Sequence, residues 1–415
     1  MQWLAGDAGL REQIAAAVAR VERDDRVEWV RKRDQRRRLA RVPLADGRSL
    51  FVKHYLANDR HALRDAWKER LGLATAQREW RTLVRLRAAG LPVPAPLAHV
   101  RIASGEHVMV MEWIEGVPLA TALCNRVERR SLLAALAALV RKLHDAGWVH
   151  RDLHRENVLV AGAVPMLIDL QAACRSRSEA ARIRDLGQLD HSLRQILSRG
   201  DRMRLRAAAL GAARPLDAGG RARVRAVGDA SLAHARAHAL SRSRRSLRAG
   251  RRFQAFECAG GRGLVSRAVD PAAVIALFAA PAQTVGYEVR RYRAAPSDLW
   301  RGSAARRAWT IAHALLASDL ACITPIAFLE WRRFGVVVHS ALVVADDCDA
   351  RAAIAPGALE ELLARLARAG FDARGLDASG VDLCQRDGRT CPRVVALEEL
   401  RFPARPRSAP SAAPR

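Results

Sequence analysis

Apolar residues recur every three or four positions in two stretches of the N-terminal half, residues 9–22 and residues 129–146. This period places the apolar side chains on one face of a helix. The pattern therefore predicts two amphipathic helices, each with one face packed on a core.

Short runs rich in β-branched and apolar residues surround the first helix pattern and predict strands. Asp46-Gly47 is a turn signal between the second and third runs, and a further helix is predicted over 60–90, where Pro92 prevents its continuation. The five predicted strands cover residues 26–30, 38–44, 49–55, 97–102 and 107–113.

The second amphipathic helix is followed by two short apolar runs, residues 157–160 and 166–170, and then by a basic, mostly helical stretch over 180–245. A meander of strands with one helix, a break at Gly116 and then a helical half is an α+β pattern with two lobes.

Three polar residues lie around these apolar runs with a spacing suited to phosphoryl transfer. Asp152 lies in His150-Arg151-Asp152, Asn157 follows five positions later, and Asp169 ends a short apolar run. A carboxylate such as Asp152 can orient an attacking hydroxyl, while Asn157 and Asp169 can hold a divalent metal against phosphates. Mg²⁺ accepts such oxygen ligands.

Lysine is scarce in this chain, which has 70 basic residues in total. Its four lysines are Lys32, Lys53, Lys68 and Lys142. Lys53 lies on a predicted strand, and an ammonium there can bind the α and β phosphates of a nucleotide when a helix carboxylate holds it. We prefer Glu79 as that carboxylate, although Glu69 lies on the same predicted helix.

A buried-looking strand ends in Glu112-Trp113-Ile114-Glu115-Gly116, between Lys53 and Asp152 along the chain. This position suits a hinge between lobes. The backbones of Glu112 and Ile114 would then pair with adenine.

Together these motifs resemble the protein-kinase-like superfamily over about residues 26–200, and most closely the bacterial lipopolysaccharide kinases that act on Kdo and core heptose. The resemblance implies a bilobal kinase fold, in which Arg184-Asp185-Leu186 would supply the helix aspartate that braces the catalytic loop. No glycine-rich loop precedes Lys53, and Asp169 is followed by Leu170-Gln171 rather than Phe-Gly. The loop is also similar to those of aminoglycoside and choline kinases.

The resemblance implies an ATP- and Mg²⁺-dependent phosphotransferase. Its acceptor would be a hydroxyl of a lipopolysaccharide inner-core sugar, on a core or lipid A glycolipid, at the cytoplasmic face of the inner membrane of a Gram-negative bacterium. Lys53, Glu79 and Asp152 would be catalytic, Lys53 with Glu112 and Ile114 would bind ATP, and Asn157 with Asp169 would bind the metal. The alternatives are a soluble small-molecule or protein kinase of the same fold, and a non-catalytic scaffold.

The C-terminal part repeats the pattern without its polar groups. Residues 147–153 align without gaps on residues 370–376, which places Gly375 at Asp152 and Gly380 at Asn157. With a short insertion Ala396 takes the place of Asp169. Upstream, residues 52–55 match 289–292, and residues 78–80 match 307–309. We therefore expect a tandem arrangement: a catalytic domain over 1–245, a truncated pseudokinase domain over 246–402 and a disordered tail over 403–415.

The formal charge is +27, which fits an anionic partner. The motifs of nucleic-acid binders are missing, so nucleic acid is not favoured. The arginines between residues 182 and 252 are candidates for peripheral contact with anionic lipid. We see no leader peptide and no apolar run long enough to span a bilayer. Seven cysteines without metal-ligand spacing are expected to be reduced thiols of a cytoplasmic protein.

Overall fold

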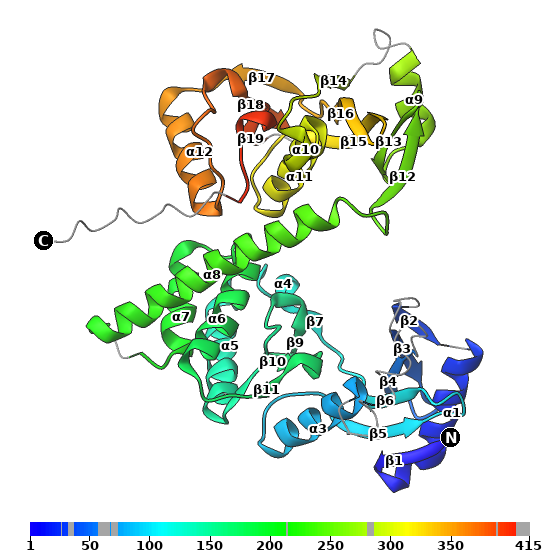
Figure 1. Cartoon of the computed structure of the whole chain (residues 1–415). Helices are drawn as coiled ribbons and strands as arrows, with labels where there is room; N and C mark the ends of the chain where they lie inside the picture. The colour runs from blue at the N-terminus through cyan, green and yellow to red at the C-terminus, as the bar shows by residue number, and fades with distance from the viewer. Residues whose placement is uncertain are drawn as a thin grey trace, which may run out of the picture. The chain divides into compact units, whose positions relative to one another are not determined.

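The computed structural model describes residues 1–25, 27–31, 37–56, 67, 74–212, 215–279, 286–386 and 389–403. The chain divides into two compact units, Met1–Ser231 and Leu232–Arg415. The division falls inside the long helix α8 (Ala218–Arg245) (Figure 1). The sequence-based boundary lies at the C-terminal end of that helix.

The N-terminal lobe of unit 1 is a six-stranded antiparallel sheet of order β1-β5-β6-β4-β3-β2. Its strands are β1 (Gln2–Gly6), β2 (Glu28–Arg31), β3 (Arg37–Pro43), β4 (Ser49–Tyr55), β5 (Pro96–Arg101) and β6 (His107–Glu112). Two helices accompany them, α1 (Arg11–Arg23) and α3 (Thr75–Ala88). The adjoining 3₁₀ turn is η1 (Ala8–Leu10).

Alternation along the strands decides which side chains meet which helix. Leu50 and Val52 of β4 share a core with the apolar face of α1. Phe51 and Tyr55 pack instead with the core that contains Leu83 of α3. Because successive strand side chains point to opposite faces, Lys53 lies on the α3 side of the sheet.

The second lobe of unit 1 is mainly helical, and its core continues into the first lobe through Leu83 and Met109. Its helices are α4 (Leu119–Ala122), α5 (Arg129–Asp145), α6 (Glu179–Leu193) and α7 (Arg199–Ala209). Small sheets of order β10-β9-β7 and β11-β8 carry the loops. They consist of β7 (Val117–Pro118), β8 (Trp148–Val149), β9 (Val158–Ala161), β10 (Val164–Leu167) and β11 (Cys174–Arg175), with the 3₁₀ turns η3 (Arg155–Asn157) and η4 (Leu170–Ala172). The predicted apolar stripe of α5 is buried as expected.

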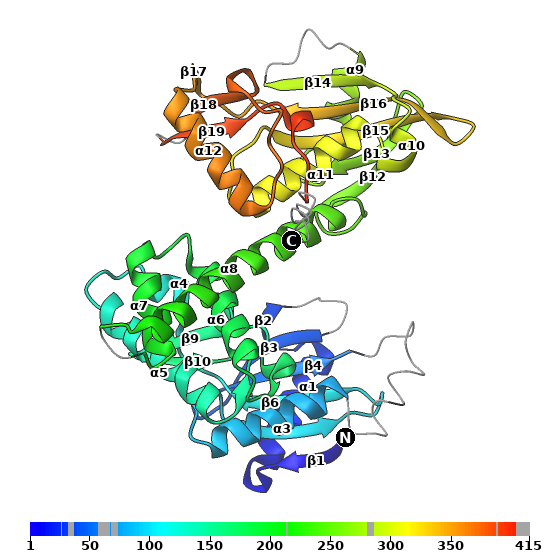
Figure 2. The same ribbon diagram turned by 60° about the vertical axis from the view of Figure 1, so that its left-hand side comes forward.

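Unit 2 has a five-stranded antiparallel sheet of order β12-β13-β15-β16-β14 and a three-stranded sheet of order β17-β18-β19 (Figure 2). Its strands are β12 (Phe253–Cys258), β13 (Gly261–Ser266), β14 (Tyr287–Arg293), β15 (Thr324–Arg333), β16 (Val336–Ala345), β17 (Ala350–Ala353), β18 (Val381–Arg386) and β19 (Arg389–Val394). Its helices are α9 (Pro271–Ala279), α10 (Asp298–Arg301), α11 (Ala304–Ala317) and α12 (Pro356–Ala369), with the 3₁₀ turns η6 (Ala378–Gly380) and η7 (Leu397–Glu399). The core of this unit is centred on Trp309, which is fully buried.

The α+β, two-lobed fold predicted for the first part of the chain is confirmed, and the five predicted strands lie within two residues of their expected ends. The strand β1 was missed, because Gln2–Gly6 is short and pairs only at the sheet edge, with β5. Of the helix predicted over 60–90, α3 is confirmed. Residues 57–66 and 68–73 lie outside the described part.

All seven cysteines are free thiols. Within the described ranges, no helix has the length and apolar character needed to cross a bilayer.

Candidate active site

A buried ion pair joins the sheet of unit 1 to α3. The Lys53 ammonium donates to both carboxylate oxygens of Glu79, at 2.8 Å each, and the two side chains are 3% and 4% exposed. The phenol of Tyr55 donates to the same carboxylate. Glu79 is thus the carboxylate that meets Lys53, whereas Glu69 lies outside the described residues.

Asp169 brings the second lobe to the same ammonium. Lys53 Nζ lies 2.8 Å from Asp169 Oδ1. The Asp169 backbone has a left-handed φ of 57°, immediately after β10. Burial alone would raise the pKa of the Asp169 carboxyl, but the cations of Lys53 and Arg37 outweigh this effect and lower the pKa to about 2. This carboxyl is therefore ionised at every physiological pH.

Arg37 is a site residue that the sequence reasoning missed. Its guanidinium donates to both carboxylate oxygens of Asp169, at 3.0 and 3.2 Å, and to Gln171 Oε1 at 3.2 Å. Arg37 pairs with Tyr55 across β3 and β4. Side chains two residues apart on a strand point to the same face, so Tyr55 lies on the face of Lys53. The residue paired with Tyr55 on β3 lies on that face as well, and this pattern could have indicated Arg37.

The loop around Asp152 is held by a buried aspartate of α6. Asp185 accepts the backbone N–H of His150 at 2.6 Å and that of Arg151 at 2.7 Å. Arg151 has a φ of 63°, a left-handed conformation that costs energy for a residue with a side chain. The bracing expected of Asp185 is present, and these two bonds stabilise the strained loop.

Asp152 lies at the end of this braced segment beside two partners. Asn157 Nδ2 donates to the Asp152 carbonyl at 2.8 Å, and His154 Nε2 is 3.6 Å from Asp152 Oδ1. The imidazole lowers the pKa of the Asp152 carboxyl, and the carboxylate in return raises the pKa of His154. Asp152 is therefore an ionised acceptor for a hydroxyl at neutral pH.

Every site residue predicted from the sequence lines one pocket of about 530 Å³ in unit 1. These residues are Lys53, Glu79, Glu112, Ile114, Asp152, Asn157 and Asp169. Apolar side chains of both lobes line it as well: Leu39, Phe51, Met111, Leu159 and Ile168. Charged and polar groups therefore converge beside an apolar slot, in an arrangement that suits a nucleotide with its base in the slot.

Some of the backbone N–H groups at the predicted hinge already donate hydrogen bonds within the protein. The Glu112 N–H donates to the Ala95 carbonyl at 3.0 Å, and the Trp113 N–H donates to the Ser49 carbonyl at 3.2 Å. In the described part of the chain, the Ile114 N–H has no such partner.

Comparison with known proteins agrees with this geometry. Residues 22–208 match the model of the lipopolysaccharide kinase (Kdo/WaaP) family. The family resemblance is confirmed for this segment. The matched residues include Lys53, Glu79, Asp152, Asn157 and Asp169.

Curated relatives match shorter segments. The 3-deoxy-D-manno-octulosonic acid kinase of Haemophilus influenzae is 30% identical over 132 residues, which cover 29% of this chain and 54% of the relative. The enzyme of the same name from Mannheimia succiniciproducens is 37% identical over 87 residues, covering 20% and 36%. A probable bifunctional tRNA threonylcarbamoyladenosine biosynthesis protein of Methanosarcina mazei is 32% identical over 114 residues, covering 28% and 19%. The chain thus spans at most about half the length of these relatives.

Among solved structures, an aminoglycoside-3'-phosphotransferase of type VIII superposes with a TM-score of 0.34 at 21% sequence identity. The match covers 52% of this chain and 98% of the phosphotransferase.

Replacing Glu79 by Ala should destabilise unit 1 by about 3 kcal/mol, because it leaves a buried ammonium with only Asp169 as its counter-charge. Urea unfolding of the full chain measures this loss. Glu179→Ala is the matched control, since Glu179 forms an ion pair with Arg223 at the surface, where both side chains are at least 42% exposed. Equal unfolding midpoints for the two variants would contradict the importance of the buried pair.

Proposed function

We propose that the chain is an ATP-dependent kinase that phosphorylates a hydroxyl of a lipopolysaccharide inner-core sugar, Kdo or heptose, at the cytoplasmic face of the inner membrane. The observation that carries the proposal is the convergence of Lys53, Glu79 and Asp169 beside Asp152 in one pocket. The family match over residues 22–208 supports the choice of a glycolipid acceptor.

The nucleotide would enter between the lobes. Its base fits the apolar slot formed by Phe51 and Leu159, with Glu112 and Ile114 offering backbone groups at the edge. Lys53, fixed by Glu79, would place its ammonium on the phosphates. Since Lys53 is 3% exposed, little conformational entropy remains for it to lose when phosphate binds.

The donors at Asn157 and Asp169 fit Mg²⁺. The amide nitrogen of Asn157 donates to Asp152, which leaves the amide oxygen for a cation. Asp169 is ionised, and its oxygens now accept from Lys53 and Arg37. When bound, Mg²⁺ would neutralise developing charge on the transferred phosphate. Arg37 would then leave Asp169 and contact the phosphates instead.

Asp152 would orient the sugar hydroxyl toward the terminal phosphate and accept its proton as the new bond to phosphorus forms. The bond between that phosphorus and the bridging oxygen would break at the same time, and ADP would leave. The lowered pKa of Asp152 keeps this group ionised. Asp185, through its bonds to the backbones of His150 and Arg151, would hold the carboxylate in place.

We also propose that unit 2 is a degenerate copy of this fold. In unit 1, the chain runs β4–α3–β5–β6, and both β4 and β5 pair antiparallel with β6. In unit 2, it runs β14–α10–α11–β15–β16, with the short α10 as an addition, and both β14 and β15 pair antiparallel with β16. Arg290 of β14 stands at the place of Lys53, and Ala308 of α11 at that of Glu79, as in the sequence alignment.

The second half of the repeat supports the same relation. A glycine with positive φ ends the helix in each case, Gly147 after α5 and Gly370 after α12. The 3₁₀ turn and strand that follow begin at aligned positions, η3 with β9 and η6 with β18. One sheet edge differs: the β12–β13 hairpin joins β15, on the side away from β14.

Arg290, which aligns with Lys53, is held by contacts within unit 2. Its guanidinium donates to the Val395 carbonyl at 2.7 Å and to Glu288 at 2.9 Å. Ala396, at the position of Asp169, offers no metal ligand. Unit 2 would therefore bind no nucleotide.

Asp152→Asn should lower transfer of labelled phosphate from ATP to Kdo- or heptose-bearing lipid by about 10²–10⁴-fold, because the amide cannot accept the proton. ATP-analogue binding should persist. Asp145→Asn, at a side chain 61% exposed, is the matched control and should keep full activity. Wild-type transfer to proteins or aminoglycosides alone would overturn the acceptor; unchanged transfer by Asp152→Asn would overturn the site.

The acid limb of kcat/KM should shift to higher pH in His154→Gln. The imidazole lowers the pKa of Asp152, and the ionised carboxylate is the active form, so activity in the wild type persists as pH falls until that lowered pKa is reached. Without the imidazole, the carboxylate protonates at a higher pH. A pH–rate profile measures the limb, and His339→Gln in unit 2 should leave it in place. An unmoved limb in His154→Gln would contradict this coupling.

The full chain should bind one molecule of a non-hydrolysable ATP analogue, since only unit 1 retains the phosphate contacts. Isothermal titration gives the stoichiometry. Lys53→Met should abolish the binding, and Arg290→Met, the matched change in unit 2, should preserve it. A stoichiometry of two, or loss of binding in Arg290→Met, would contradict the assignment of unit 2 as a degenerate copy.

A further inference from the structure

Exposed apolar side chains gather at one place on unit 2. They lie on α10 and on the β15–β16 hairpin, and include Trp300 at 81% exposure and Phe334 at 95%. The Ala294 N–H donates to the Val338 carbonyl at 3.2 Å, which holds the segment before α10 against β16. We call this surface the α10–hairpin face; its exposed apolar residues are Leu299, Trp300, Phe334, Val336 and Val338.

The hairpin tip holds its phenylalanine in an unfavourable conformation. Arg333 pairs with Val336, so Phe334 and Gly335 form a two-residue turn. Phe334 has a φ of 50° and Gly335 a φ of 82°. Such turns favour Asn or Gly at the first position, and a bulky side chain is rare there. Since the ring is almost fully exposed, the fold gains little from it.

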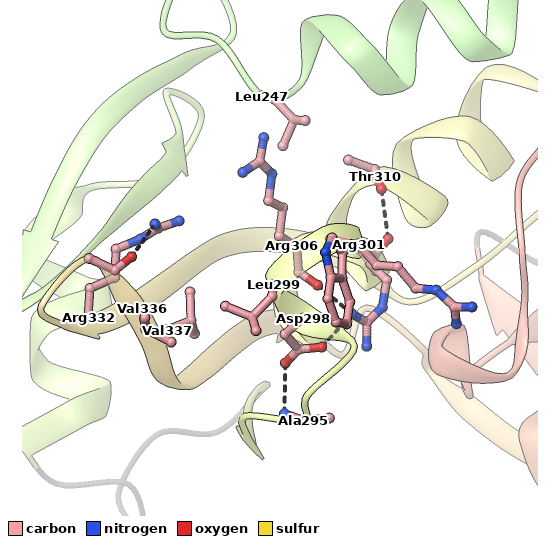
Figure 3. Close-up of a pocket in the computed structure, with 14 residues that line it drawn as sticks. Leu247, Ala295, Asp298, Leu299, Arg301, Arg306, Thr310, Arg332, Val336 and Val337 are labelled. Atoms are coloured by element: carbon pink, nitrogen blue, oxygen red, sulfur yellow. Dashed lines mark hydrogen bonds and ion pairs between the residues drawn. The ribbon is translucent and has the colours of Figure 1, made fainter.

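Arginine side chains lie around the α10–hairpin face, and only some of them form ion pairs with other described residues. They line a pocket of about 430 Å³ beside Leu299 and Val336, which Figure 3 shows with Arg301, Arg306 and Arg332 around it. Asp298, the acid in the pocket lining, is paired with Arg307 at 2.6 Å, and Arg332 of the lining is paired with Glu330 at 2.7 Å.

Two further arginines of the pocket, Arg301 and Arg306, have no ion-pair partner among the described residues. Arg333 stacks over the Phe334 ring at 5.6 Å. The charge that remains is therefore positive and lies next to the exposed rings.

We propose that the α10–hairpin face docks on an anionic phospholipid bilayer. Exposed Trp and Phe side chains partition into the boundary between headgroups and acyl chains. Guanidinium groups bind headgroup phosphates through paired N–H donors. The aromatic tips and the unpaired arginines lie on the same face, so both contributions act together. This inference concerns unit 2 alone and holds whether or not the proposed kinase reaction is correct.

The arginines that the sequence analysis favoured for lipid contact, between residues 182 and 252, are partly used inside the fold. Arg202 and Arg206 both bind the buried carboxylate of Asp190, at 2.8 and 2.7 Å. Arg223 forms an ion pair with Glu179 at 2.7 Å. These three side chains are less available to a membrane than those of the α10–hairpin face.

Co-sedimentation of the full chain with vesicles tests the proposal. Vesicles of phosphatidylethanolamine and phosphatidylglycerol should bind the chain, and vesicles of phosphatidylcholine alone should bind it at least tenfold more weakly. The double variant Trp300→Ser, Phe334→Asn should weaken binding to anionic vesicles at least tenfold. Each of Arg301→Gln and Arg306→Gln should weaken it about fivefold. Val127→Ser, at a side chain 90% exposed in unit 1, and Arg374→Gln, at one 88% exposed, are matched controls that should bind as the wild type does.

The single variant Phe334→Asn distinguishes a loss of vesicle binding from a loss of stability. Asn tolerates the left-handed conformation of this turn better than Phe, so this variant should raise the melting temperature while it weakens vesicle binding. Wild-type vesicle binding by the Trp300→Ser, Phe334→Asn variant would overturn the proposal. So would light scattering that shows a wild-type dimer and a monomeric variant, since the face would then join two copies of the chain.

Discussion

The pocket of unit 1 depends on one ammonium group. Lys53 binds Glu79 of α3 on one side and Asp169 of the second lobe on the other, each at 2.8 Å. A buried ammonium is costly unless opposite charge surrounds it, so the positions of α3, β4 and the segment after β10 are linked through a single side chain. The same cation contributes to lowering the pKa of Asp169 to about 2. The ion pairs that link the two lobes of unit 1 therefore also keep the Asp169 carboxyl ionised.

A second buried carboxylate, that of Asp185, contacts the His144 side chain at 3.3 Å and also binds the backbone. By accepting the N–H groups of His150 and Arg151, it stabilises a left-handed residue directly before Asp152. Strain of this kind persists only where surrounding contacts hold it. Through Asp185, the helix α6 thus holds the backbone that orients the Asp152 carboxylate.

In the proposed duplication, aligned positions of the two units hold different side chains. Where unit 1 has a lysine between two carboxylates, unit 2 has Arg290, bonded to Glu288 and to the Val395 carbonyl. The planar guanidinium reaches backbone and carboxylate together, whereas the ammonium is a compact charge. If unit 2 is a degenerate copy, its cleft would have lost metal and phosphate ligands while the strand–helix–strand order persisted. Its exposed aromatic and arginine side chains lie elsewhere, on the α10–hairpin face.

The amino-acid sequence by itself determined the elements and the candidate chemistry. The period of apolar residues indicated α5 and the strands of the first sheet, and the spacing of Asp152, Asn157 and Asp169 indicated the class of site. It left the choice between Glu79 and Glu69 open, and it missed Arg37, Tyr55 and the edge strand β1. Only the tertiary structure decided these, because strand register and helix packing bring together residues that are far apart along the chain. Lys53 and Asp169 are separated by more than a hundred positions, and no local pattern records which distant charge will neutralise a buried one.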